Sequence, residues 1–273
     1  MRISVPASSA NLGAGFDVLG MALAIPAELG IVDGEVPEKA EIARGAHPAA
    51  TAFASAGGRG QVWVRTSIPS GRGLGFSGAV RVGAIALALQ QSSSDDVLAT
   101  RRKEIFERAA VLEGHGDNVA ASAFGGVVVV ADGSVGRVPL AVDPAVVVWI
   151  PSFKTNTSES RATLSTSVSR VDAVFNIGRS SLFVAALASG EVELLREATR
   201  DRLHQDARLA AATASRDALE AALNTSAWAA WLSGSGPTVA VMCDRLDAER
   251  ISAAWPNGRS MIVSIDRIGA HWL

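Results

Sequence analysis

Apolar and polar positions along the chain predict strands and helices in mixed order. Residues 61–67 alternate in polarity, which is typical of a half-buried strand. Residues 77–89 form an apolar run rich in Ala, Val and Leu that predicts a helix. Residues 102–113 carry apolar side chains at helical spacing, and Gly114 is a typical residue after a helix end. This part of the chain therefore predicts a sheet covered by helices.

The remaining pattern extends this mixture to the end of the chain. Further strands are predicted at residues 2–6, 17–25, 127–130, 146–150, 227–232, 238–242 and 260–265. Further helices are predicted at residues 172–188, 191–200, 213–223 and 247–254, with residues 47–56 as an additional candidate. The pattern changes near residue 145 without a flexible linker. We therefore predict two closely packed domains, residues 1–145 and residues 146–273.

Composition narrows the class of protein. The chain has 273 residues, 48% of them hydrophobic, which is enough for a substantial core. The lone Cys243 excludes a disulfide framework and a cysteine-based zinc site. A net charge of −2 with dispersed basic residues argues against nucleic acid or an acidic membrane as partner. No uninterrupted apolar run reaches roughly 18 residues, and no signal peptide is evident. These features predict a soluble cytoplasmic protein.

The strongest local signal is a glycine-rich segment between a predicted strand and a predicted helix, residues 68–78 (IPSGRGLGFSG). Glycines allow positive φ angles and close approach of a ligand to the backbone. The start of a helix offers free N–H groups and a positive dipole end, which suit phosphate. Phe76 and Ser77 follow Gly75 where a Walker loop requires Lys and Ser or Thr, so this is a different loop. Taken alone, such a segment is equally compatible with a tight connection.

Two further loops of small residues strengthen the phosphate interpretation. Residues 6–17 (PASSANLGAGFD) carry Asn11 and Asp17, and residues 233–238 (SGSGPT) lie between two apolar strands. Each loop alone is weak evidence, because Asp and Asn are also common turn residues. Three such loops in one chain indicate a binding site built from all of them.

The three segments resemble the three motifs of the GHMP small-molecule kinases. Residues 107–126, which include EGHGDN and FGG, make the chain most similar to the homoserine kinases, as do residues 174–179 and 201–208. The resemblance runs from residue 2 to about residue 265. It implies an α+β fold of two domains, with a ribosomal S5-like N-terminal half and a ferredoxin-like C-terminal half around a central cleft. It also implies ATP and Mg²⁺ as co-substrates, L-homoserine as phosphoryl acceptor in threonine biosynthesis, and a homodimer as an open expectation.

The resemblance assigns phosphate and metal roles to individual residues. The residues implied to bind ATP phosphates are Pro69, Gly71, Arg72, Gly73, Leu74, Gly75, Phe76 and Ser77. Ser77 and Glu107 are implied to hold Mg²⁺. By spacing alone, Glu107 is a solvated residue of its helix, so the metal role depends on the matched motif.

The resemblance also assigns substrate and catalytic roles. The residues implied to bind substrate are Asn11, Asp17, His115, Arg161 and Arg208, and the catalytic set is Asp17, Asn118, Thr157 and Arg161. Guanidinium forks suit a carboxylate or a phosphoryl group, although each arginine could instead form a surface ion pair. Asn118 cannot accept a proton, so we expect electrostatic stabilisation, with Asp17 as the only carboxylate candidate for a base. His204 and Glu113 are expected to have structural roles.

Two departures from the family pattern leave alternatives open. Phe76 replaces a serine of the phosphate signature and places a ring at the start of the helix. Residues 30–60 are short for the family, so the adenine contacts cannot be identified. The alternatives are a GHMP kinase for another small alcohol, and a non-catalytic nucleotide- or ligand-binding relative in which Phe76 blocks phosphate.

Overall fold

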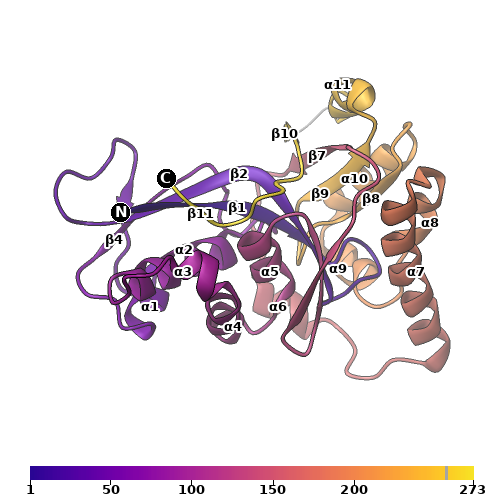
Figure 1. Cartoon of the computed structure of the whole chain (residues 1–273). Helices are drawn as coiled ribbons and strands as arrows, with labels where there is room; N and C mark the ends of the chain where they lie inside the picture. Colours follow the sequence, from indigo (N-terminus) through magenta and orange to yellow (C-terminus); the bar gives the residue numbers. More distant parts are fainter. Residues whose placement is uncertain (256–257) are drawn as a thin grey trace.

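The fold contains two β-sheets (Figure 1). The computed structural model describes residues 1–255 and 258–273, without the side chains of residues 157 and 158. The first sheet has the order β11-β1-β2-β4-β3, with β5 paired to β2 and β6 to β5. Its strands are β1 (Arg2–Ala10), β2 (Leu19–Ile31), β3 (Glu41–Ile42), β4 (Val62–Thr66), β5 (Val127–Ala131), β6 (Ser134–Val138) and β11 (His271–Trp272). The second sheet has β7 (Ala145–Ile150), β8 (Ala229–Leu232), β9 (Val239–Cys243) and β10 (Arg259–Val263).

Helices cover both sheets. In the N-terminal half, α1 (Pro48–Ser55), α2 (Phe76–Gln90), α3 (Val97–Thr100), α4 (Arg102–Glu113) and α5 (Asp117–Phe124) lie on one side of β1 and β2 (Figure 1). The C-terminal half carries α6 (Thr157–Ala162), α7 (Arg170–Ser189), α8 (Leu195–Ala198), α9 (Gln205–Ala211), α10 (Thr213–Leu223) and α11 (Ala248–Ser252). Two 3₁₀ turns, Val192–Leu194 and Arg245–Asp247, precede α8 and α11.

The second sheet confirms the ferredoxin-like prediction. Its order is β10-β7-β9-β8, and every pair in it is antiparallel. Numbered along the chain, these strands have the order 4-1-3-2, with helices between the first and second and between the third and fourth. The division into two domains after residue 145 stays a prediction. β7 of the second sheet begins at Ala145, the last residue of the predicted first domain, and β11 of the predicted second domain pairs with β1 of the first sheet.

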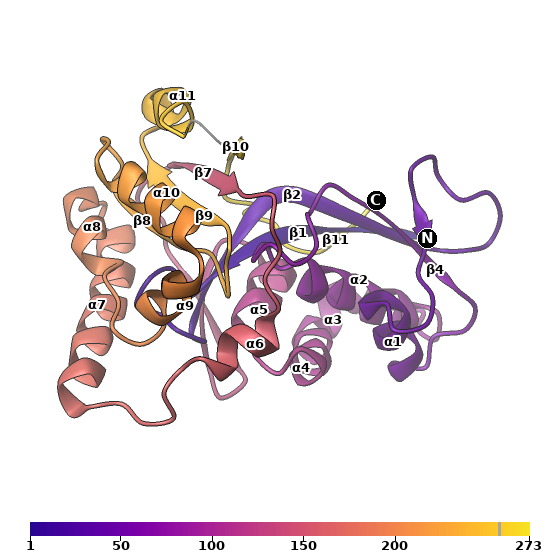
Figure 2. The ribbon, with the colours of Figure 1, turned by 180° about the vertical axis from the view of Figure 1, so that it is seen from behind.

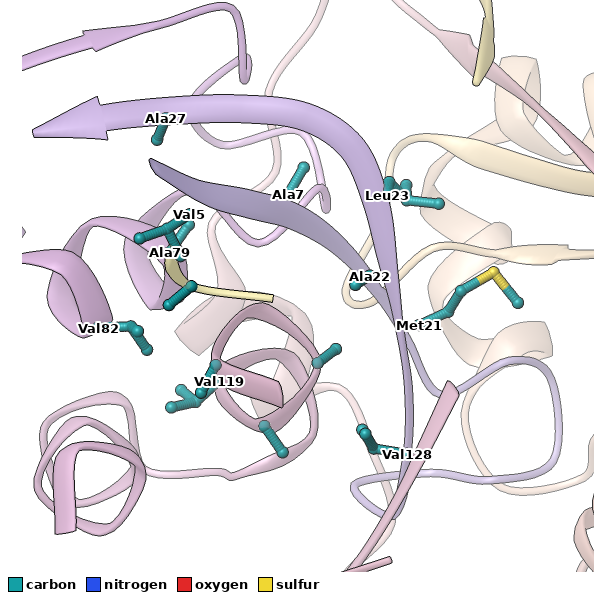
Figure 3. Packing of buried hydrophobic residues seen from close by; sticks show 14 of the residues in the cluster. Val5, Ala7, Met21, Ala22, Leu23, Ala27, Ala79, Val82, Val119 and Val128 are labelled. Carbon is teal, nitrogen blue, oxygen red and sulfur yellow. The ribbon is translucent and has the colours of Figure 1, made fainter. Parts of the chain in front are cut away.

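A single hydrophobic cluster joins the two halves. Val5 and Ala27 of the first sheet belong to this cluster together with Ala79 and Val82 of α2, and Figure 3 shows Val5 beside Ala79. The same cluster includes Phe183 of α7 and strand residues of the second sheet, so the two halves share part of one core. This close packing of the two halves determines where the loops of one half contact the loops of the other.

Most predicted elements are confirmed, and the differences have local causes. The helices predicted at residues 102–113 and 213–223 have these bounds in the structure. β1 extends to Ala10, beyond the predicted end at residue 6, because Ser8 and Ser9 pair with Ala22 and Met21. The predicted helix 191–200 is a 3₁₀ turn followed by the four-residue α8. The elements without a prediction are α3, α5, α6, α9, β3, β6 and β11, which are too short to show a clear period.

Helix α7 is long and apolar enough to cross a membrane, judged by length and composition alone. This helix also packs within the fold, because Phe183 and Leu187 lie in the shared core and Asn176 Nδ2 donates to the carbonyl of Ala14 in the first loop. The buried apolar side chains of α7 lie in its C-terminal half, whereas Val171, Val174 and Ile177 of its N-terminal half are exposed.

Phe183 should be a major contributor to the shared core. It is fully buried and packs edge-on against Trp231, with ring centroids 6.4 Å apart. We expect Phe183→Ala to lower the free energy of unfolding by about 3–5 kcal/mol, because the truncation leaves a cavity. Urea denaturation measures this loss. Phe153→Ala, at a 40% exposed ring, is the matched control, and an equal loss in both variants would contradict the shared core.

Candidate active site

A pocket of about 440 Å³ lies where the three predicted loops meet. Its lining residues come from α1 and α2 of the N-terminal half and from α6 and α9 of the C-terminal half, which Figure 2 shows from right to left across the view. Of the residues predicted for substrate and catalysis, the pocket is lined by Asn11, Asp17, His115, Asn118, Arg161 and Arg208. The predicted phosphate residues from Pro69 to Ser77 line it as well. Thr157 begins α6, but its side chain lies outside the described residues.

A buried chain of hydrogen bonds ties the three loops together. The Trp231 indole N–H donates to Ser9 Oγ (2.9 Å), and Ser233 Oγ donates to the carbonyl of Gly73 (2.6 Å). Ser9 Oγ and Ser233 Oγ lie 2.7 Å apart. Because the only proton of Ser233 goes to the carbonyl, Ser9 must donate to Ser233. One ordered chain therefore links all three loops away from water.

Further hydrogen bonds to backbone carbonyls connect the same loops. The N–H of Gly234 donates to the carbonyl of Ala10 (3.2 Å), and Asn11 Nδ2 donates to the carbonyl of Gly234 (2.9 Å). The N–H of Ser8 donates to the carbonyl of Leu74 (3.2 Å). Asn11 is thus committed largely to holding the loops in place, which bears on its predicted substrate role.

The first loop holds an unusual backbone. Asn11, Leu12 and Asp17 have φ angles of 69°, 46° and 58°. Asn and Asp tolerate this region, whereas a leucine there is uncommon and strained. Strain of this kind persists where the surrounding structure imposes it, often at functional sites. It turns Asp17 into the pocket, with the Asp17 N–H bound to Asn11 Oδ1 (3.1 Å).

The glycine-rich loop needs its glycines. Gly73 and Gly75 have φ angles of 72° and 66°. A methyl group at Gly73 would lie 2.2 Å from the carbonyl oxygen of Ser233, and one at Gly75 would lie 1.9 Å from Ser8 Oγ. Gly75 caps α2, so the first N–H groups of this helix lie at the pocket wall. This is the geometry that suits a bound phosphate group.

Arg72 differs from its predicted role. Its guanidinium donates to the carbonyls of Pro151 and Ser152, the latter at 2.7 Å. The N–H of Thr155 also donates to the carbonyl of Gly71 (3.1 Å). Arg72 therefore fastens the glycine-rich loop to the segment after β7, and its fork is not free for phosphate in this structure.

The structure does not place Glu107 beside Ser77. Glu107 lies half-exposed on α4 and pairs with Lys103 (3.7 Å), outside the pocket. The carboxylate that accepts from Ser77 Oγ is that of Glu113, which lines the pocket and also pairs with Arg81. The prediction for Glu107 is corrected accordingly, because the pocket-facing side of α4 carries Glu113.

Phe76 lines the pocket without filling it. Its ring packs against the shared core and meets His47 edge-on, with centroids 5.9 Å apart. His47 caps α1, since its Nδ1 accepts from the N–H of Ala49 (3.1 Å), and burial lowers its pKa. Together with Pro48 and Glu41, these side chains form the end of the pocket nearest α1.

At the other end, Asp17 and Arg161 form a two-point ion pair. Arg161 Nη1 and Nη2 donate to the two carboxylate oxygens of Asp17, both at 2.7 Å. The hydrogen bond to Asp17 raises the pKa of Arg161. Both charged groups line the pocket. A positively charged group of a ligand would replace Arg161 as the partner of Asp17, and a negatively charged group would replace Asp17 as the partner of Arg161.

His115 lies beside a buried carboxylate. His115 Nδ1 and Asp117 Oδ1 are 2.8 Å apart, and Asp117 also accepts from the N–H of Asn118 (2.7 Å). An ionised carboxylate only accepts, so Nδ1 donates and Nε2 of a neutral ring is an acceptor. Asn118 Oδ1 accepts from Ser8 Oγ (2.8 Å), which ties α5 to the first strand.

Arg208 is held by a neutral histidine. His204 Nε2 lies 2.8 Å from the carbonyl of Gly13, and His204 Nδ1 lies 3.1 Å from Arg208 Nη1. A carbonyl only accepts and a guanidinium only donates, so His204 carries its proton on Nε2. Burial lowers the pKa of His204 and keeps this tautomer neutral. The structural role predicted for His204 is therefore confirmed by its contacts.

Several residues that form the site have no predicted role in binding or catalysis. Glu113 is predicted to have a structural role, although its position just before His115 indicates that it lies at the same site. Ser9 and Ser233 belong to recognised loops, but nothing in their identity indicates that they bond to each other. Arg81 stands one helical turn after Ser77, and that spacing could have indicated a second charge beside the phosphate helix.

Comparison with known proteins agrees with this geometry. Residues 38–126 match the GHMP kinases N terminal domain, and residues 183–258 match the GHMP kinases C terminal domain. The homoserine kinase of Leifsonia xyli is 39% identical over 99% of this chain and 91% of its own. That of Thermus thermophilus is 36% identical over 99% and 98%.

Solved structures show the same fold. The homoserine kinase from Cytophaga hutchinsonii superposes with a TM-score of 0.83, at 22% identity, over 100% of this chain and 97% of that one. A protein described as a putative homoserine kinase from Listeria monocytogenes superposes with a TM-score of 0.76, at 26% identity, over 100% and 98%.

The neutral state of His204 should make stability depend on pH. Below about pH 6.5 a histidine in the unfolded chain takes up a proton, whereas folded His204 resists protonation because its pKa is lowered. The unfolded state then binds more protons, so the parent loses stability as the pH falls from 7 to 5. His204→Gln keeps a donor and an acceptor without titrating. Urea denaturation of both proteins should show a steeper loss for the parent, and parallel curves would refute the assignment.

Proposed function

The chain belongs to the GHMP kinase family, and we propose that it transfers the γ-phosphoryl group of ATP to the side-chain hydroxyl of L-homoserine. The hydroxyl oxygen forms a bond to the γ-phosphorus while the bond from that phosphorus to the β-γ bridging oxygen breaks. The products are O-phospho-L-homoserine, ADP and the hydroxyl proton. This product is a precursor of threonine, so the activity belongs to threonine biosynthesis.

The observation that carries this proposal is the arrangement of charge around the pocket. A helix start and a glycine loop suit phosphate at one wall, while Asp17, Arg161 and Arg208 line the wall near α6 and α9. An amino acid presents an ammonium and a carboxylate, which match one acidic and two guanidinium groups. Full-length relatives named homoserine kinase, at 34–39% identity, support the same acceptor.

We assign Arg208 to the substrate carboxylate and Asp17 to the substrate ammonium or the reacting hydroxyl. Arg161 then stabilises either the carboxylate or the transferring phosphoryl group. Because Asp17 and Arg161 bind each other in the free protein, the ligand must separate or share this pair. Phosphoryl transfer mainly requires positioning and charge stabilisation, which these groups can supply.

The proton of the hydroxyl has two candidate acceptors. Asp17 is one, but both of its oxygens are engaged by Arg161. His115 is the other, since its Nε2 is left as an acceptor when Nδ1 donates to Asp117. Asn118 cannot take the proton, and its oxygen is engaged by Ser8, so its role is to hold α5 at the pocket.

Ser77 and Glu113 fit Mg²⁺, which neutralises charge on the phosphates of ATP when bound. Both supply oxygen donors, as this hard cation prefers. Within the described part of the chain, no group of three His, Cys, Asp or Glu side chains could form a protein-only metal site. Arg81 already neutralises much of the charge on Glu113. These residues therefore favour a metal that arrives with the nucleotide and is held mainly by phosphate oxygens.

The end of the pocket near α1 is our proposed nucleoside side. Phe76, His47 and Pro48 give it an apolar wall, and the orientation of Phe76 leaves the start of α2 at the pocket surface. This arrangement argues against the alternative in which Phe76 blocks phosphate. A kinase for another small alcohol is the second alternative, and the paired charges of Asp17 and Arg161 favour an amino acid over an uncharged alcohol.

A panel of acceptors tests the proposal. ADP release is measured with ATP and Mg²⁺ against L-homoserine, other hydroxylated amino acids and isoprenoid alcohols. We expect the highest kcat/KM with L-homoserine. A higher value with an uncharged alcohol would refute the acceptor assignment. Nucleotide binding without turnover on any acceptor would support the non-catalytic alternative.

Glu113 and Glu107 form a matched pair of variants for the metal assignment. We expect Glu113→Gln to raise the Mg²⁺ concentration for half-maximal activity by roughly tenfold or more, because a carboxylate ligand is lost. Glu107→Gln, on an exposed face of the same helix, should leave it unchanged. The Mg²⁺ dependence of ADP release measures both. The reverse result would restore Glu107 as the metal carboxylate.

A further inference from the structure

Phe16 packs behind Arg161 and Arg208, two arginines that line the pocket. The guanidinium carbon of Arg161 lies 5.4 Å from the centroid of its ring, and that of Arg208 lies 5.3 Å from it. The imidazole of His204 is stacked on the ring, with centroids 5.2 Å apart and planes 28° apart. One aromatic side chain thus contacts both arginines proposed to bind the substrate and the histidine that holds one of them.

The two arginines need a common support. They come from separate short helices, α6 and α9, and their like charges repel each other. Burial, and after it the nearby charge of Arg161, lower the pKa of Arg208, while the charges of Asp17, Asp201 and Asp117 partly oppose this shift. Arg161 is hydrogen-bonded to its counter-charge Asp17, whereas the hydrogen bonds of Arg208 within the described residues go to neutral acceptors, His204 and the carbonyl of Gly234 (3.1 Å).

We propose that Phe16 is a positioning residue that holds the guanidinium groups of Arg161 and Arg208 in place for the substrate, with Arg208 directed at its carboxylate. The face of an aromatic ring is electron-rich and attracts a guanidinium group within about 6 Å of its centroid. Phe16 therefore offers both cations an attractive surface that carries no net charge. This role rests on the proposed function.

An acidic residue at this position could not do the same. It would neutralise the arginines and compete with the carboxylate of the substrate. The ring attracts both guanidinium groups through its face and does not neutralise their charge. Its neighbour Asp17 binds Arg161 directly, so residues 16 and 17 together fix the position of the first arginine.

The closing experiment compares Phe16→Leu with two other substitutions. Leucine keeps an apolar side chain without a π face, and Phe16→Trp restores the π face. Phe175→Leu is the matched control, because the ring of Phe175 has Arg202 and Arg179 at 4.0 and 4.2 Å but lines a different cavity. Steady-state kinetics with L-homoserine and ATP are measured for each variant, with thermal unfolding as a check on folding.

We expect Phe16→Leu to raise KM for L-homoserine about tenfold, since a partly desolvated cation–π contact is worth about 1–2 kcal/mol and about 1.4 kcal/mol corresponds to tenfold. KM for ATP should change less than about twofold. Phe16→Trp should recover most of the loss. Phe175→Leu should leave both KM values unchanged, even if it lowers the melting temperature.

Substitution of Phe16 by 3,4,5-trifluorophenylalanine keeps the shape of the ring while withdrawing electron density from its face, and it provides the test if Phe16→Leu does not fold. KM for L-homoserine should rise here too. Equal changes in both KM values, or an unaltered KM for L-homoserine in the fluorinated protein, would overturn the positioning role. Failure of the parent to phosphorylate L-homoserine would refute the proposed function, and is distinct from either result.

Discussion

The hydrogen-bond chain from Trp231 through Ser9 and Ser233 to the carbonyl of Gly73 is the constraint on which the site depends. Its members come from β8, β1, the loop after β8 and the glycine-rich loop. Buried donors and acceptors are costly when unpaired, so each bond in the chain disfavours separation of the loops. The pocket exists because the two halves meet at this chain, and the shared core fixes the halves around it.

Several ionisable side chains at the pocket have ionisable partners within the protein. Asp17 pairs with Arg161, Glu113 with Arg81, and His115 with Asp117. In each pair, one group suits a part of ATP or of L-homoserine, and the other group is its partner from the protein. Binding then exchanges partners between groups that are already positioned, which costs less ordering than collecting free side chains.

The sequence predicted the loops well and the contacts between them poorly. Glycine spacing and a helix after a strand are local features, so the phosphate loop and the limits of α4 could be identified directly. The choice between Glu107 and Glu113 could not, because six residues on a helix turn a side chain by about 600°, onto a different face. Only the packing of α4 on α2 decides which carboxylate meets Ser77. Arg72 shows the same limit, since its partners belong to a segment about 80 residues away.

A double-mutant cycle of Ser9→Ala and Ser233→Ala tests the central claim most directly. The free energy of unfolding and the Kd for ADP are measured for the parent, both single variants and the double variant. If the chain links the loops, the two substitutions should be coupled by about 0.5–3 kcal/mol in stability, and either one alone should weaken ADP binding. Additive effects on stability with unchanged ADP affinity would contradict the account.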